Sequence, residues 1–222
     1  MSVALHRLRQ PQRANESLDA PLTAAEQATM VGAAATKLEE LFDILRIDHR
    51  NDHNTRDTPR RVARMLIEEL MQGRYSDPPA ITEFDNVQRF NELIVIGPIA
   101  LRSTCAHHLM PIHGDVFVGV LPSPDGKIIG LSKYDRIVEH FASRLQIQEE
   151  LVQQIGEFIW QRTAPQGLAV RVSAVHMCRT QRGVRGSQQG RMVTSAYFGS
   201  LAEDAARKEE FLRECLALGK GA

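Results

Sequence analysis

Apolar positions in the first third of the chain recur at helical spacing. From Thr23 to Leu45 they return every three or four residues and end before a polar turn, which predicts a long amphipathic helix. A second helix is predicted at Asp57-Thr58-Pro59, where Thr58 can cap the helix and Pro59 fits the first helical position. Residues 23–78 are therefore expected to form an N-terminal helical region, whereas residues 1–22 lack apolar periodicity and are expected to be a flexible leader.

After two prolines at 78 and 79 the pattern changes to short β-rich runs. The predicted strands are residues 92–101, 114–121, 128–131, 168–178 and 191–200. The predicted helices are one beginning at Ser132, one over residues 148–160 and one from about 203 to 217. Helices followed by a sheet that a helical pair interrupts indicate an α+β fold with an antiparallel sheet, here a single domain over residues 79–222.

Composition narrows the range of partners. Lysine and arginine total 27 in this chain of 222 residues and are balanced by 27 acidic residues, so bulk attraction to nucleic acid or to a membrane surface is not expected. No stretch has the apolar length of a secretory signal or a membrane span, which predicts a cytoplasmic protein. Three cysteines make a poor disulfide framework, and a cysteine close to several histidines is better interpreted as a metal ligand or catalyst.

The densest chemical signal lies in two short segments. Cys105, His107 and His108 stand in a turn after a predicted strand, and His176 and Cys178 end another strand, where a period of two places them on one face. Mixed thiolate and imidazole ligands suit Zn²⁺. Spacing alone leaves two alternatives open: a catalytic zinc with three protein ligands and a water, or a closed structural zinc with His176 as the fourth ligand.

A second group of residues resembles an anion site. Ser132 is a plausible N-cap with Asp135 at the capping-box position, so the positive helix end would face the same way as Lys133, with Arg136 one turn further. Arg182 could add a guanidinium group. Alone, this pattern is also typical of a solvated helix surface.

Two carboxylates, Glu149 and Glu150, begin the following helix. One carboxylate can accept hydrogen bonds from both N1–H and the exocyclic amine of guanine. Acidic residues in a first helical turn are also the ordinary response to the helix dipole, so the residues alone do not select this function.

Taken together, four motifs in order resemble the GTP cyclohydrolase I family, from about Thr23 through the C-terminal helix. They are Ser-Thr-Cys-Ala-His-His-Leu-Met-Pro at 103–111, Gly-Leu-Ser-Lys-Tyr-Asp-Arg-Ile-Val at 130–138, Gln-Ile-Gln-Glu at 146–149, and His-Met-Cys with Arg-Gly-Val at 176–184. The resemblance implies a tunnelling (T-fold) antiparallel sheet with paired helices. It also implies a homo-oligomer, usually a decamer with active sites between subunits.

The resemblance further implies the roles of individual residues. The zinc ligands would be Cys105, His108 and Cys178, and the catalytic pair would be His107 and His176. The substrate contacts would be Ser132, Lys133, Arg136 and Arg182 on the triphosphate, Arg61 from a neighbouring subunit, and Gln148 with Glu149 on the guanine. The implied reaction converts GTP and water to 7,8-dihydroneopterin triphosphate and formate, the first step of folate and pterin biosynthesis.

The match departs from the family pattern at Ala106, where most members carry glutamate, and at Glu150, where a basic residue is usual. A missing carboxylate beside the metal would alter how neighbouring side chains are oriented. Two alternatives therefore stand beside the main prediction: a divergent T-fold enzyme acting on another purine or pterin, for example in deazaguanine metabolism, and a zinc-stabilised paralogue without catalysis.

Overall fold

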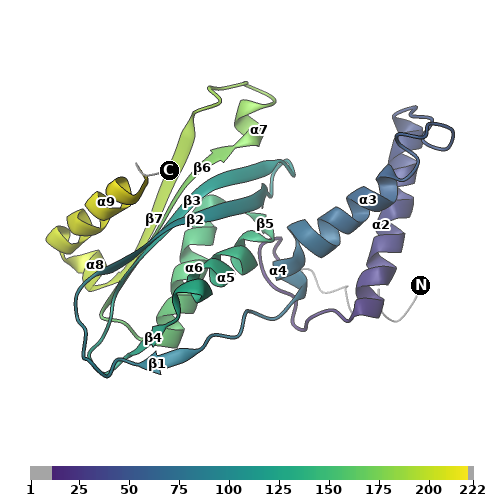
Figure 1. Cartoon of the computed structure of the whole chain (residues 1–222). Coiled ribbons are helices and arrows are strands. Elements are labelled where there is room, and N and C mark those ends of the chain that lie inside the picture. The colour runs from purple at the N-terminus through teal and green to yellow at the C-terminus, as the bar shows by residue number, and fades with distance from the viewer. Residues whose placement is uncertain (1–11, 220–222) are drawn as a thin grey trace. The chain divides into compact units, whose positions relative to one another are not determined.

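The computed structural model describes residues 12–219 and divides the chain into two compact units, Met1–Asp77 and Pro78–Ala222 (Figure 1). Part of the predicted leader, residues 1–11, lies outside the described residues. The rest of the leader is hydrogen-bonded within the first unit, since the backbone N–H of Leu18 donates to the carbonyl of Arg74 at 3.0 Å. Leu18 and Leu22 also pack against the apolar cluster of that unit.

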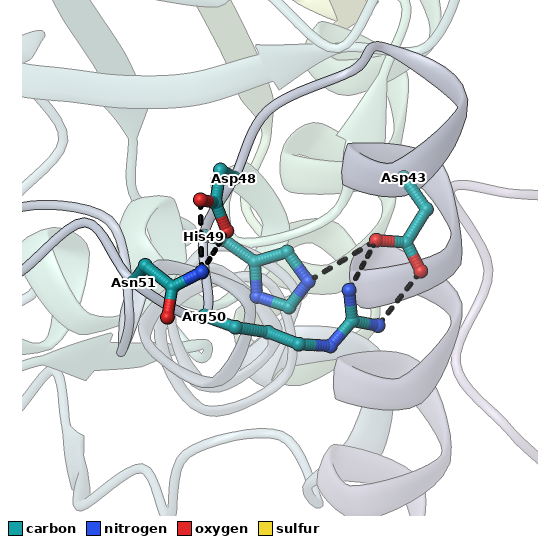
Figure 2. A network of polar contacts seen from close by, with 5 residues as sticks. All are labelled: Asp43, Asp48, His49, Arg50 and Asn51. Carbon is teal, nitrogen blue, oxygen red and sulfur yellow. Dashed lines mark hydrogen bonds and ion pairs between the residues drawn. The ribbon is translucent and has the colours of Figure 1, made fainter.

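The first unit is built on helix α2 (Ala24–Ile44), as predicted. Thr23 is its N-cap and forms a capping box with Glu26, which satisfies two N–H groups at the helix start. The polar turn after α2 is tied back to the helix by Arg50, which donates to both carboxylate oxygens of Asp43 at 2.7 and 2.8 Å (Figure 2). This ion pair lowers the pKa of Asp43 and fixes the exit from the helix.

The second predicted helix begins with Asp57, not Thr58, as its N-cap and is divided into three parts. Helix α3 (Thr58–Arg64) continues into a wider π-helical turn, η1 (Met65–Leu70), and then into α4 (Gln72–Tyr75). The apolar side chains of these parts pack on α2 around Val31, Ala63 and Ile67.

The second unit contains a five-stranded sheet in the order β5-β2-β3-β6-β7. Its strands are β2 (Ile94–Cys105), β3 (Pro111–Leu121), β5 (Leu145–Gln146), β6 (Gly167–His176) and β7 (Arg191–Gly199). All neighbours are antiparallel except β2 and β5, which pair in parallel at Thr104–Leu145 and Cys105–Gln146. The register places Ile112 of β3 opposite His176, the last residue of β6.

The two faces of this sheet are covered differently (Figure 1). Helices α5 (Leu131–Ala142) and α6 (Gln148–Thr163) pack on one face over the main core, which includes Val116, Ile137 and Ile155. The short helix α8 (Ser200–Glu203) leads to α9 (Ala205–Gly219), whose Phe211 packs on the other face in a smaller cluster. An antiparallel-rich sheet with paired helices, preceded by an N-terminal helical region, confirms the predicted α+β class.

Two sequence predictions about strands were wrong. Strand β4 (Lys127–Ile129) does not continue the main sheet but pairs with β1 (Glu83–Asp85) in a separate two-stranded sheet. The predicted strand 168–178 ends at His176, because β3, its partner, begins at Pro111 and offers no backbone groups beyond that point. Residues Met177–Thr180 form the helical turn α7 instead.

Candidate active site and metal centre

Cys105 ends strand β2 and begins the tight turn that leads to β3. Two backbone hydrogen bonds close this turn, from Leu109 N–H to the Cys105 carbonyl at 2.9 Å and from Cys105 N–H to the Met110 carbonyl at 2.8 Å. The next residue, Ala106, donates its N–H to the carbonyl of Gln146 in β5 at 3.0 Å. The Cys105 side chain is buried, and its backbone is held on both sides.

The second half of the site lies at the end of β6. His176 is the last residue of the strand and Cys178 is the second residue of α7, so the two do not share a strand face as predicted. The helical turn nevertheless brings them together with Cys105: the ligand atoms of Cys105, His176 and Cys178 all lie within 4.8 Å of one another. Two segments about seventy residues apart in sequence therefore present two thiols and one imidazole to one point.

This group of three has the chemistry of a metal site. Burial raises the pKa of Cys178 and the adjacent Cys105 raises it further, whereas the charge of Arg182 lowers it. Ionisation of two neighbouring thiols is unfavourable, because the two thiolates repel each other unless a cation lies between them. Two thiolates and a nitrogen donor are a soft set that suits Zn²⁺, so the residues fit the predicted metal.

The other two histidines lie on the exposed turn between β2 and β3. Nδ1 of His107 is 3.9 Å from the Cys105 sulfur. The ring centroid of His108 is 6.4 Å from that of His107, and His108 is not a member of the three-residue group. The histidine that lies among the thiols is thus His176, and the ligand role of His108 stays a prediction.

His176 is held by a buried amide. Its Nε2 lies 2.7 Å from Oε1 of Gln148, the first residue of α6, and the Gln148 side chain is only 1% exposed. Burial lowers the pKa of His176, and the negative charge of Glu149 opposes this effect. Glu149 is itself exposed beside the site, whereas Gln148 is directed inward.

Helix α5 has the predicted cations but a different N-cap. The N-cap is Gly130, which is already extended (ψ 143°) directly after β4, so the helix begins at Leu131 and the predicted capping role of Ser132 was wrong. Ser132 lies exposed in the first turn, and within residues 12–219 its hydroxyl makes no hydrogen bond. Lys133 donates to the carbonyl of Ala80 at 3.3 Å, and Arg136 is exposed one turn further.

The remaining predicted cations come from two places. Arg182 is exposed in the loop after α7, and its positive charge lowers the pKa of Cys178. In the part of the chain that the structure describes, neither Arg136 nor Arg182 forms an ion pair. Arg61 belongs to the first unit, where its guanidinium lies 3.5 Å from the carboxylate of Asp57.

Sequence reasoning missed Thr194, a β7 residue that contacts the site indirectly. Its hydroxyl accepts a hydrogen bond from Nε2 of Gln148 at 3.0 Å. The available signal was Thr194 itself, a polar residue at a core-facing position of β7. The next two core-facing residues of this strand, Ala196 and Phe198, are apolar.

The family model for GTP cyclohydrolase I matches residues 34–216. The chain belongs to the GTP cyclohydrolase I family. Curated relatives named GTP cyclohydrolase 1 include one from Mycobacterium ulcerans, 44% identical over 160 residues that cover 71% of this chain and 77% of the relative. Another, from Shewanella baltica, is 38% identical over 178 residues, covering 80% and 81%.

Family membership makes the chain a hydrolase. Among solved structures, archaeosine synthase QueF-Like in the apo form aligns with a TM-score of 0.36 and 14% identity, over 55% of this chain and 97% of that one. Over residues 12–219, no helix combines the length and the apolar composition that crossing a bilayer requires.

Proposed function

We propose that this family member is a zinc-dependent GTP cyclohydrolase I, which opens the imidazole ring of GTP and releases formate and 7,8-dihydroneopterin triphosphate at the start of folate and pterin biosynthesis. The observation that carries the proposal is the convergence of Cys105, His176 and Cys178 within 4.8 Å, in a chain that matches the family model over most of its length. The cations Lys133 and Arg136 of α5, of which Arg136 is exposed, and the exposed carboxylate of Glu149 support a nucleotide as the substrate.

In this proposal the metal ligands are Cys105, Cys178 and His108. A zinc ion held there would supply Lewis-acid activation of water for hydrolysis of the purine C8 position. His176 and His107 move protons to and from the ring as the imidazole and then the ribose open. His176 is suited to this role because burial lowers its pKa, so that the ring is neutral and can accept a proton.

The rest of the site holds the two ends of the nucleotide. Glu149 accepts hydrogen bonds from N1–H and the exocyclic amine of guanine, and Gln148 can contribute only through its backbone because its side chain is buried. The triphosphate is held by Ser132, Lys133, Arg136 and Arg182, with Arg61 supplied by a neighbouring subunit of a homodecamer. Fixing both ends positions C8 against the reacting groups.

The test is incubation of the zinc-loaded protein with GTP, following formate release and the fluorescence of the oxidised pterin product. We expect both signals, and their absence from a zinc-replete oligomer would contradict the proposal. The absence of a carboxylate at Ala106 keeps a second candidate beside this proposal, a divergent T-fold enzyme acting on another purine or pterin. Formate release from related purine nucleotides with no preference for GTP would support that alternative.

A further inference from the structure

Gln148 connects the candidate acid–base histidine to the interior of the fold. Its Oε1 lies 2.7 Å from Nε2 of His176, whereas its Nε2 faces three oxygen atoms of strands β6 and β7. Those oxygens are Thr194 Oγ1 at 3.0 Å, the Met192 carbonyl at 3.1 Å and the Val172 carbonyl at 3.4 Å. The amide is therefore bonded at both ends.

This arrangement allows only one orientation of the amide. Two of the three oxygens are backbone carbonyls, which can only accept hydrogen bonds, so the NH₂ group of Gln148 must face them. The reversed amide would place its oxygen against carbonyl oxygens at a site that is 1% exposed, leaving buried polar groups unsatisfied. Oε1 must therefore face His176.

The orientation of the amide determines the tautomer of His176. An amide oxygen has no proton to donate, so Nε2 of His176 must carry the hydrogen in the bond between them. In the neutral imidazole the lone pair is then on Nδ1. Because Nε2–H is engaged with Gln148, Nδ1 is the ring nitrogen left for other partners.

We infer that Gln148, held by Thr194, is a positioning residue that fixes His176 as the Nε2–H tautomer and leaves Nδ1 as the ring nitrogen available to the reaction. This gives the Gln148 side chain a role other than the guanine contact that the resemblance implied. It rests on the proposed function, in which His176 moves protons. Because Gln148 touches no substrate through this side chain, its loss is expected to change turnover and not binding.

The first experiment determines the tautomer without using activity. Magic-angle-spinning NMR of zinc-loaded protein labelled with ¹³C,¹⁵N-histidine distinguishes the two neutral tautomers, and the spectrum of His176→Gln identifies the signals of His176. We expect the Nε2–H form in the native chain and a mixture of tautomers in Gln148→Leu. An Nδ1–H tautomer in the native chain would overturn the inference, and this result is independent of whether GTP is the substrate.

The second experiment separates positioning from substrate contact. With GTP, we expect Gln148→Leu to lower kcat about 10- to 100-fold, as the loss of a partner behind an active-site histidine usually does, with KM and zinc content unchanged. A raised KM with native kcat would instead identify a substrate contact and overturn the inference. If the native protein releases no formate from GTP, the proposed function fails while the NMR result on the tautomer still stands.

A milder pair of variants guards against misfolding of Gln148→Leu. Thr194→Val keeps the shape of the side chain but removes the hydroxyl that accepts from Gln148, and Thr194→Ser keeps the hydroxyl. We expect Thr194→Val to lower kcat with unchanged KM and zinc content, and Thr194→Ser to retain native kcat. Equal kcat for the two variants would contradict the proposed part of Thr194.

Discussion

At the scale of single residues, the pH dependence of stability can be predicted from a buried histidine outside the candidate site, His140. His140 of α5 is 7% exposed, and its Nε2 lies 2.8 Å from the guanidinium of Arg144. Since arginine can only donate, the neutral ring accepts this hydrogen bond. Burial, and then the charge of Arg144, lower the pKa of His140 to about 4.

This residue predicts a loss of stability in mild acid. His140 takes up a proton near pH 6.5 in the unfolded chain but only near pH 4 in the folded chain. Between these pH values protonation favours the unfolded chain, so the free energy of unfolding is highest above about pH 6.5 and falls as the pH drops toward 4. We expect a loss of about 2 kcal/mol in the free energy of unfolding over this window. Urea unfolding at several pH values, followed by the single tryptophan, Trp160, measures it.

The control for this prediction is His140→Gln, which can still accept a hydrogen bond from Arg144 but does not titrate. Its free energy of unfolding is expected to depend less on pH than that of the native chain between pH 6.5 and 4. Parallel curves for the two proteins would show that His140 does not contribute.

The metal ligands can be separated from the acid–base histidine by metal content. We predict that Cys178→Ala loses zinc, because it removes one of two thiolates, whereas His176→Ala keeps zinc and loses turnover. Elemental analysis of the purified variants measures the first property, and formate release from GTP measures the second. If His176→Ala loses zinc as completely as Cys178→Ala, the four-ligand structural site is the better description.

Residue type was sufficient to find Cys105, His176 and Cys178, because thiol and imidazole groups are rare and cluster for chemical reasons. It could not choose between His108 and His176 as the nitrogen nearest to the thiols. Nor could it find the bond between Gln148 and Thr194, since a contact between residues 46 positions apart depends on how α6 packs on β7.

At the scale of elements, periodicity predicted the type of the longer helices and strands, but not which strands pair. The β-rich run at 128–131 indicated a strand correctly, yet the three residues of β4 contain nothing that selects β1 over the main sheet. The end of β6 was misplaced because the strand ends opposite the first residues of β3, and the sequence of β6 does not reveal where its partner begins. Packing between elements also determines whether replacing a helix glycine by alanine raises or lowers the free energy of unfolding.

Two helix glycines are predicted to respond oppositely to alanine. A Cβ on Gly156 of α6 would lie 2.3 Å from the ring of Phe198 in β7, which itself stacks on Trp160. We expect Gly156→Ala to destabilise the second unit by about 1–3 kcal/mol, because the ring must move. Urea unfolding followed by Trp160 fluorescence measures the loss.

The matched variant is Gly32→Ala in α2. This glycine is exposed, and a Cβ added to it meets nothing within 4 Å. Alanine should therefore stabilise the first unit by about 0.5–1 kcal/mol through helix propensity alone, as measured by far-UV circular dichroism during urea unfolding. A destabilised Gly32→Ala, or a Gly156→Ala of native stability, would contradict the packing described for these helices.

At the scale of the whole molecule, the proposed substrate contacts belong to both compact units. Arg61 is in the first unit, and every other proposed contact is in the second. The proposal that Arg61 acts on the site of a neighbouring subunit can be examined by mixing two variants, Arg61→Ala and His176→Ala, each expected to be inactive with GTP.

If Arg61 acts between subunits, refolding the two variants together should restore activity to about a quarter of the sites, those that combine a native Arg61 with a native His176. Formate release from the mixture, compared with each variant refolded alone, measures the recovery. An inactive mixture of correct oligomeric mass would show that both residues serve the site of their own chain or that the subunits do not exchange.

The two-residue strand β5 has a consequence for how this chain can change in length during evolution. Its parallel pairing places Gln146 beside Cys105, so residues 105–146 form a loop that is closed by hydrogen bonds between β2 and β5. Gln146 stands two residues before Gln148. Insertions at the turn 123–126, between β3 and β4, enlarge the loop without moving its closure. One residue added between Gln146 and Gln148 would turn Gln148 by about 100° around the α6 axis and away from His176. Length variation among natural relatives is therefore expected at the turn 123–126 and not at the β5–α6 junction.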